Sequence, residues 1–175
     1  MKRAALLRAV NVGGRQVRMA ELRAALAEPF GEVRTLLASG NVVLDAPDPS
    51  PALETRLEAI FQARFGFVAE FLVRDAAELD GVIAASPFPE ETADHPAKVA
   101  VTFFRDPPDP ALAVQTAAGH DGPERAVLIG RELYVDYPEG LGLSTLDRTM
   151  RGLRWPKLAT TRNWNTVLKL RAALD

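Results

Sequence analysis

The sequence predicts an α+β protein built from two ferredoxin-like (α/β-plait) subdomains with a C-terminal helical extension. Two observations support this fold class. In residues 1–74 the apolar patterns follow the order strand, helix, strand, strand, helix, strand. In residues 98–175 the same order begins again and lacks only a clear closing strand. The repeat lies in the order of the elements and not in residue identity.

Residues 1–74 carry the clearer of the two patterns. Short β-branched or aliphatic runs indicate strands, and apolar residues at helical spacing indicate helices. Glycine or proline stands at most of the breaks between these segments. The expected strands are 3–10, 33–38, 41–46 and 67–73, and the expected helices are 18–28 and 51–65.

The rest of the chain is predicted as a connector and a second subdomain. Residues 75–97 form the connector, because one short apolar helix is followed there by an acidic stretch that contains prolines. Residues 98–175 form the second subdomain. Its expected elements are strand 98–104, helix 109–119, strand 125–130, strand 132–137 and helical segments to the end.

Composition excludes several classes of protein. Hydrophobic residues make up 47% of the 175 residues, which is enough for a substantial core. Cysteine is absent, so disulfides, thiolate metal sites and cysteine nucleophiles are excluded. No apolar run approaches the roughly 18 residues of a membrane span. Arg8 interrupts the N-terminal apolar run, which argues against a signal peptide. We therefore expect a cytoplasmic protein.

Charge is unevenly distributed along the chain. Residues 1–23 hold six bases and one acid (+5), and residues 148–175 hold seven bases and one acid (+6). Residues 24–147 hold eight bases and 21 acids (−13), so the net charge is −2. If the fold joins the two ends, they form a positive surface that attracts anions. Alternatively, these charges solvate separate faces. The acidic centre argues against a general nucleic-acid binder.

Topology predicts that two polar loops meet at one edge of the first sheet. In the ferredoxin-like order, the first and second strands run the same way with the third antiparallel between them. The loop after the first strand and the hairpin between the second and third therefore emerge at the same edge. The first loop contains Asn11, Gly13, Gly14 and Arg15, and the hairpin contains Ser39, Gly40 and Asn41.

Each loop also has a simpler explanation. The stretch NVGGR precedes a helix, where backbone N–H groups and the helix dipole can hold an anion. It matches neither the Walker motif nor the dinucleotide fingerprint, and a tight turn explains its glycines. The stretch ASGNV is explained by a hairpin turn whose glycine and asparagine adopt left-handed conformations.

The stretch TTRNWNTVLKL near the end of the chain predicts a helix. A helical wheel centred on Trp164 places Val167 and Leu168 on its side, which predicts that all three belong to the core. Thr160 or Thr161 is expected to cap the helix.

Three polar residues of that stretch exceed what capping needs. They are Arg162, Asn163 and Asn165. A surplus of hydrogen-bonding groups beside free helix amides suits an anionic or highly polar ligand.

No residue pattern indicates a reaction. His95 and His120 stand in loops without the partner spacing of a zinc site, and lone loop histidines are usually solvated. The G-x-S-x-G motif of serine hydrolases is missing. The expected central strands of the first sheet lack the aromatic residues with which an RNA-recognition sheet stacks bases. No metal or cofactor is predicted, and whether the chain is an enzyme is left open.

Three blocks of the sequence resemble the bacterial family known as domain of unknown function 1697. They are LLRAVNVGGRQVRMAELR, LLASGNVVLDA and ATTRNWNTVLKL. The resemblance covers essentially the whole chain and implies two ferredoxin-like subdomains with an added C-terminal helical portion. It implies no activity. Two departures are Ala9 and Val10, where the family usually has Gly-Ile, and Thr145, where it tends to have lysine.

The leading hypothesis is a protein that binds an anionic small molecule, such as a nucleotide or a phosphorylated metabolite, in a cleft. The expected contacts are Arg8, Asn11, Gly13, Gly14 and Arg15 on one wall, Ser39 and Asn41 on a second, and Arg162, Asn163 and Asn165 on a third. One alternative is a protein-interaction or structural module whose motifs serve folding and subdomain docking. The other is a weak nucleic-acid binder.

Overall fold

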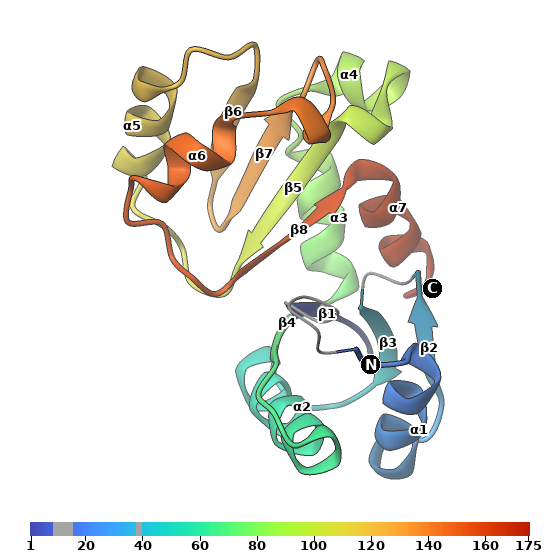
Figure 1. Cartoon of the computed structure of the whole chain (residues 1–175). Helices are drawn as coiled ribbons and strands as arrows, with labels where there is room; N and C mark the ends of the chain where they lie inside the picture. The colour runs from blue at the N-terminus through green and yellow to red at the C-terminus, as the bar shows by residue number, and fades with distance from the viewer. Residues whose placement is uncertain (9–15, 38–39) are drawn as a thin grey trace. The chain divides into compact units, whose positions relative to one another are not determined.

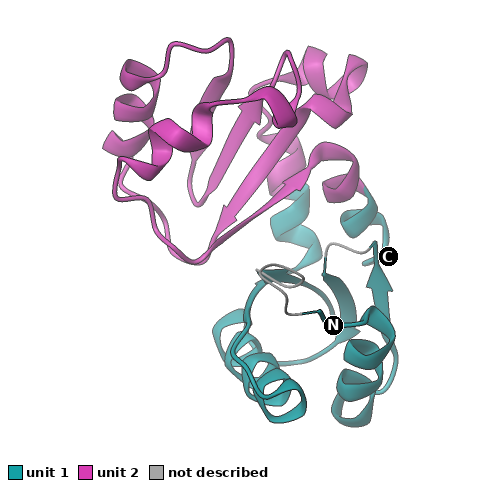
Figure 2. Cartoon of the chain, in the orientation of Figure 1, with its two compact units in different colours: residues 1–80, 169–175 teal, residues 81–168 magenta. Residues whose placement is uncertain are grey.

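The computed structural model describes residues 1–8, 16–37 and 40–175, and the chain divides into two compact units (Figure 2). Unit 1 comprises residues 1–80 and 169–175, and unit 2 comprises residues 81–168. The division falls within α3 (Ala76–Ala84) and α7 (Trp164–Ala172), so both helices contribute to both units. The subdomain limits expected from the sequence, at residues 74 and 98, stay a prediction.

Unit 1 contains a four-stranded antiparallel sheet in the order β2-β3-β1-β4 (Figure 1). Its first six elements are β1 (Lys2–Arg8), α1 (Met19–Phe30), β2 (Val33–Leu36), β3 (Asn41–Asp45), α2 (Ser50–Phe65) and β4 (Glu70–Arg74). Both β1 and β2 pair antiparallel with β3, so they run the same way. This is the ferredoxin-like topology, and the order predicted from the sequence is confirmed.

Helices α1 and α2 cover one face of this sheet (Figure 1). Helix α2 forms because Leu53, Leu57 and Phe61 recur every fourth residue, and all three are fully buried in the core. Burying each such side chain stabilises the fold by about 1.5–3 kcal/mol. The helix ends at Gly66, whose φ of 76° is left-handed and whose N–H donates to the Gln62 carbonyl.

The opposite face of the same sheet is also buried. Leu6 points to that face and is fully inaccessible. The start of α3 and the end of α7 belong to this unit. Arg171 of α7 pairs with Asp80 of α3 at 2.6 Å, and Arg34 of β2 donates to the Ala173 carbonyl at 3.2 Å. The last residues of the chain are thus tied to unit 1 by side chains from two different elements.

Unit 2 repeats the sheet order as β6-β7-β5-β8. Its elements after α3 are α4 (Pro89–Asp94), η1 (Pro96–Lys98), β5 (Val99–Phe104), α5 (Ala111–Gly119), β6 (Arg125–Ile129), β7 (Glu132–Asp136), η2 (Leu141–Leu143), α6 (Leu146–Arg151) and β8 (Ala159–Asn163). Strand β8 is the closing strand that the apolar pattern of the sequence did not predict. The fold class, two ferredoxin-like units with a C-terminal helix, is confirmed.

The sheet of unit 2 is also covered on both faces. On the side of α5 and α6, the ring of Trp155 stacks on Phe104 with centroids 5.5 Å apart, and its Nε1–H donates to Thr116 Oγ1 at 3.1 Å. On the other side, the Tyr134 hydroxyl donates to the Val82 carbonyl of α3 at 2.9 Å. Burial raises the pKa of Tyr134, so this hydroxyl keeps its proton at neutral pH.

Among the described residues, no helix is long and apolar enough to cross a membrane.

Candidate functional site

The predicted site begins at the end of the unit 1 sheet where β1 ends and β3 begins. The Leu7 N–H donates to the Gly40 carbonyl at 2.8 Å, so the residues that flank the two predicted loops lie side by side. The convergence of these strand ends, expected from topology, is therefore confirmed. The predicted contacts Asn11, Gly13, Gly14, Arg15 and Ser39 lie outside the described residues, and their part in a site stays a prediction.

Gly40 is required by the hairpin in two ways. Its φ of 76° is left-handed, as the hairpin interpretation of ASGNV expected. The same expectation for the asparagine is wrong, because Asn41 is the first residue of strand β3 and has no positive φ. A Cβ at this position would come within 3.0 Å of the Leu7 Cβ. The close approach of β1 to the hairpin therefore depends on glycine, which has no side chain, at position 40.

Arg8 lies at this sheet end in an ion pair. Its Nη1 is 2.9 Å from Oε2 of Glu70, the residue directly opposite in β4. The two side chains are 32% and 29% exposed. A pair at this exposure is worth only about 0–1 kcal/mol, so a more highly charged anion can compete with Glu70 for the guanidinium.

Asn41 uses its carboxamide within the fold. The residue is fully buried, and its Nδ2 donates to the Leu36 carbonyl at 3.0 Å across the β2–β3 hairpin. The side chain thereby supplies a donor to a backbone carbonyl of the hairpin. This contact gives Asn41 a structural role, and a ligand contact stays a prediction.

Arg162 lies in strand β8 and not in the expected helix. Its guanidinium donates to Thr160 Oγ1 and to the Thr161 carbonyl, both at 2.8 Å. The side chain is buried on the face of the sheet that carries Val101, its partner in β5. Burial lowers the pKa of Arg162 to about 10, so the group still carries its charge at neutral pH.

Asn163, rather than a threonine, caps helix α7. Its Oδ1 accepts hydrogen bonds from the Thr166 N–H at 3.0 Å and from the Thr166 hydroxyl at 2.8 Å. The predicted cap at Thr160 or Thr161 is wrong, because both residues belong to β8 and the helix begins only at Trp164. The cap is the last residue of the strand, so one asparagine ends one element and starts the next.

The core prediction for this helix is partly confirmed. Trp164 and Val167 are buried, whereas Leu168 is 40% exposed. The buried stripe of α7 is centred on Val167 and continues to Leu170 and Leu174. Trp164 lies at the margin of that stripe, and Leu168 lies beyond the margin. The helical wheel placed Leu168 in the core because it was centred on Trp164, whereas the buried face is centred on Val167.

The basic ends of the chain do not produce a basic unit. Unit 1 contains 12 bases and 12 acids, and unit 2 contains 9 bases and 11 acids, which gives net charges of 0 and −2. Both termini belong to unit 1, where their bases meet acids. Arg3 pairs with Asp75 at 3.1 Å, and Arg171 pairs with Asp80. A broad positive surface is therefore not supported, and any anion site must be local.

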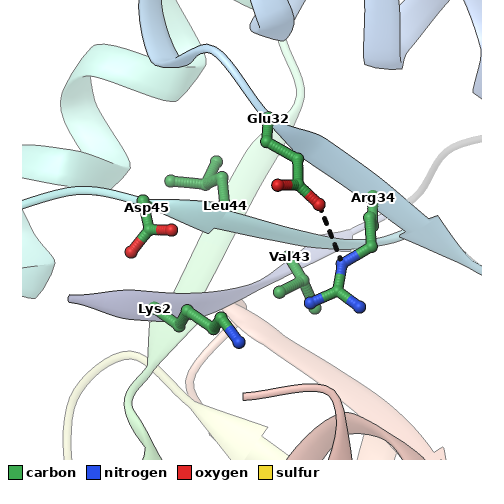
Figure 3. A pocket seen from close by; sticks show the side chains of 6 residues that line it. All are labelled: Lys2, Glu32, Arg34, Val43, Leu44 and Asp45. Carbon is green, nitrogen blue, oxygen red and sulfur yellow. Dashed lines mark ion pairs between the residues drawn. The ribbon is translucent and has the colours of Figure 1, made fainter. Parts of the chain in front are cut away.

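A small hollow of about 140 Å³ lies at the other end of β1 and β3 (Figure 3). Its lining residues are Lys2, Glu32, Arg34, Val43, Leu44 and Asp45. Lys2 Nζ donates to the carbonyl of Asp175, and Arg34 donates to that of Ala173. These cations thus hold the last carbonyls of the chain, as cations commonly do after a helix. The hollow is smaller than the roughly 300–1,000 Å³ of ligand pockets.

His120 was expected to be solvated in a loop, and that expectation is wrong. Its side chain is 4% exposed, and its Nε2 lies 2.6 Å from Glu124 Oε2. The signal that the sequence offered was the glycine and proline between the two residues, which turn the chain back on itself. Within the described ranges, no group of three or more His, Asp or Glu side chains could hold a metal ion.

Comparison with known proteins identifies the family. The sequence model of a "Protein of unknown function (DUF1697)" matches residues 1–134. The chain belongs to the DUF1697 family. The resemblance to this family is thereby confirmed. The match includes the first two sequence blocks, whereas the third block, at residues 159–170, lies beyond it. The match assigns no reaction. No curated protein matches this DUF1697 chain.

A solved structure confirms the fold of this DUF1697 protein over its whole length. The chain is similar to the conserved bacterial protein SP0830 from Streptococcus pneumoniae, with a TM-score of 0.77 and 21% sequence identity. The match covers 99% of this chain and 97% of the other. At this identity the likeness concerns the fold alone.

Proposed function

We propose that this DUF1697 protein binds an anionic small molecule, such as a nucleotide or a phosphorylated metabolite. The proposed site is the end of the unit 1 sheet where β1 ends and β3 begins. The hydrogen bond from the Leu7 N–H to the Gly40 carbonyl carries the proposal. This bond joins the end of β1 to the residue just before β3, which are the two points where the polar loops meet the sheet. The proposed contacts are Arg8, Asn11, Gly13, Gly14, Arg15, Ser39 and Asn41.

Arg8 is the described residue best suited to hold the charge. A guanidinium offers paired N–H donors that match the geometry of a phosphate group. Glu70 fixes the guanidinium at the sheet end and still leaves about a third of it exposed. Backbone N–H groups of a glycine-containing loop before a helix would supply further donors.

The third predicted wall belongs to unit 2. Arg162 and Asn163 have hydrogen bonds within β8 and at the start of α7, and Asn165 is half-buried. Their contact with a ligand stays a prediction, which the same binding assay tests with Arg162→Gln.

A thermal-shift screen tests the proposal. The probes are ATP, GMP, glucose 6-phosphate and inorganic phosphate, with uncharged glucose as the reference. Binding at 100 times the dissociation constant stabilises the fold by about 2.7 kcal/mol, which gives a measurable rise in melting temperature. Arg8→Gln should abolish the rise. Arg23→Gln removes an exposed arginine of α1 and should preserve it. If none of the anions raises the melting temperature of the unaltered chain, the proposal is wrong.

The second candidate is a protein-interaction or structural module whose polar motifs serve folding. The cap formed by Asn163 and the hairpin contact of Asn41 favour it, because each accounts for a motif residue without a ligand. Under this alternative, Asn163→Ala lowers stability and changes no anion binding. The two candidates therefore differ in the binding assay and not in the unfolding assay.

A further inference from the structure

A second polar cluster lies in unit 2, between the loop after α5 and helix α6. The His120 Nε2 is 2.6 Å from Glu124 Oε2, and the His120 Nδ1 is 3.3 Å from Thr149 Oγ1. The imidazole therefore stands between a carboxylate and a hydroxyl, with one ring nitrogen on each. The side chains of His120 and Glu124 are 4% and 5% exposed, whereas Thr149 is half-buried.

We propose that Thr149, His120 and Glu124 form a nucleophile, base and carboxylate triad that hydrolyses a small ester or thioester. A hydroxyl within reach of a base, with the base oriented by a third group, is the arrangement by which enzymes activate a hydroxyl nucleophile. The site lies in unit 2 and is independent of the anion site proposed for unit 1.

The carboxylate sets the tautomer that the reaction needs. Burial alone would raise the pKa of Glu124, but hydrogen bonds from Ser144 and His120 lower it, so the carboxylate is ionised at neutral pH. An ionised carboxylate only accepts hydrogen bonds, so the neutral imidazole carries its proton on Nε2. The lone pair on Nδ1 then faces the Thr149 hydroxyl, as a general base requires.

The turn between the two residues is built for their contact. A Cβ on Gly122 would lie 2.3 Å from Glu124 Oε2 and 2.4 Å from His120 Nε2. Real atoms do not approach so closely, so a side chain at this position would displace the imidazole and the carboxylate from their present contact.

A hollow of about 280 Å³ opens on the pair, just under the roughly 300–1,000 Å³ of ligand pockets, and it limits the substrate to a small molecule. Its lining residues are Thr116, Ala117, His120, Glu124, Arg125, Ala126 and Leu146. Thr149 is not one of these lining residues; it follows Leu146 by three residues in α6, and residues so spaced share a face of a helix. The alanine and leucine side chains of a small hollow suit a short acyl chain.

Other charged groups stand near the triad. Arg125 lines the hollow, and its charge is paired with Asp136 at 2.8 Å. Asp147 of α6 and Glu124 both act on Tyr137, whose pKa is raised to about 12 by burial and by these two charges. Tyr137 therefore stays protonated and does not act as a base in this cluster.

The reaction balances without a cofactor. The Thr149 Oγ attacks the acyl carbon as its proton passes to His120 Nδ1, and the bond from that carbon to the leaving oxygen or sulfur breaks. The leaving group takes the proton from His120. Water then attacks the acyl-threonine and gives a proton to His120, the Oγ–acyl bond breaks, and the returning proton restores the Thr149 hydroxyl. The products are a carboxylic acid and an alcohol or thiol.

Acylation by p-nitrophenyl acetate tests the proposal on the whole chain. We expect release of p-nitrophenolate, and mass spectrometry of peptides should find the acetyl group on Thr149. Absence of acetyl-Thr149 at every pH between about 5 and 9 overturns the proposal, and this outcome requires no variant to fold.

Matched variants localise the chemistry. Thr149→Val should abolish the adduct, and His120→Gln should slow acylation by about 10²–10⁴-fold. Thr145→Val removes an exposed hydroxyl just before the same helix and should leave the rate unchanged. Gly122→Ala should slow acylation, while Gly142→Ala, where a Cβ meets open space, should not. If Thr149→Val hydrolyses the ester at the unaltered rate, the triad is excluded.

Discussion

The Asn163 carboxamide oxygen accepts two hydrogen bonds from Thr166, one from its backbone N–H at 3.0 Å and one from its hydroxyl at 2.8 Å. One side chain thus satisfies two donors in the first turn of α7. Because β8 ends at Asn163 and α7 begins at the next residue, no linker separates the two elements. The cap fixes the point at which the chain changes from strand to helix.

Replacing this cap should destabilise the fold. We expect Asn163→Ala to lower the free energy of unfolding by about 1 kcal/mol, because the Thr166 N–H loses its acceptor. Asn163→Asp keeps the acceptor and adds a negative charge at the helix N-terminus, so it should be at least as stable as the unaltered chain. Urea unfolding measures both changes. Asn165→Ala, two residues after the cap, is the control. Equal losses of unfolding free energy in both alanine variants would refute the capping role.

The hairpin glycine should be less replaceable than another left-handed glycine. Gly40→Ala adds a Cβ at 3.0 Å from Leu7, in addition to the left-handed strain. Gly66→Ala has the same φ of 76° and meets nothing within 4 Å, so it isolates the strain. We expect Gly66→Ala to cost about 1 kcal/mol and Gly40→Ala clearly more. Chemical unfolding of both variants compares them, and similar losses would mean that the contact with Leu7 relaxes freely.

The sequence predicted the first plait well because each element there obeys one rule. Strand β3, for example, is a short apolar run after a glycine turn, and α2 repeats its apolar residues at helical spacing. Strand β8 was missed because its inward positions carry Thr160 and Arg162. Polar residues at buried positions hide the alternation on which strand prediction depends.

The errors at the candidate site follow from that missed strand and from contacts that sequence spacing does not reveal. The residues TTRN end strand β8 instead of starting the helix, so the cap is Asn163 and not a threonine. The meeting of His120 and Glu124 depends on the conformation of the turn at Gly122, and it joins residues four apart outside any helix. Convergence of the β1 and β3 ends was predictable, because it follows from strand order alone.

Removing the acid at the β1 sheet end should strengthen anion binding. In Glu70→Gln the carboxylate no longer competes for Arg8, and the repulsion between Glu70 and a bound anion disappears. We expect a several-fold lower dissociation constant for the anion that the thermal-shift screen identifies, with stability changed by less than about 1 kcal/mol. Isothermal titration calorimetry measures the constant. Glu28→Gln, an exposed acid of α1, is the control for net charge. If the unaltered chain, Glu70→Gln and Glu28→Gln bind the anion with equal affinity, the anion does not bind at Arg8.

Acid should destabilise unit 2 through Glu124. The pKa of this carboxyl lies below its ordinary value of 4.5, because hydrogen bonds from Ser144 and His120 outweigh the opposing effect of burial. A lowered folded-state pKa means that the folded chain binds the proton less tightly than the unfolded chain does. Ionised Glu124 therefore stabilises the fold above about pH 4.5, and this contribution is lost as the pH falls through the folded-state pKa.

Urea unfolding at a series of pH values separates this carboxyl from the others. Glu124→Gln should be less stable than the unaltered chain at neutral pH, and the difference should shrink as the pH falls below about 4.5. Glu139→Gln, an exposed acid whose side chain has no hydrogen-bond partner in the structure's described part, should follow the unaltered chain at every pH. A constant difference between Glu124→Gln and the unaltered chain across the series would show that the pair with His120 does not depend on the charge of the carboxylate.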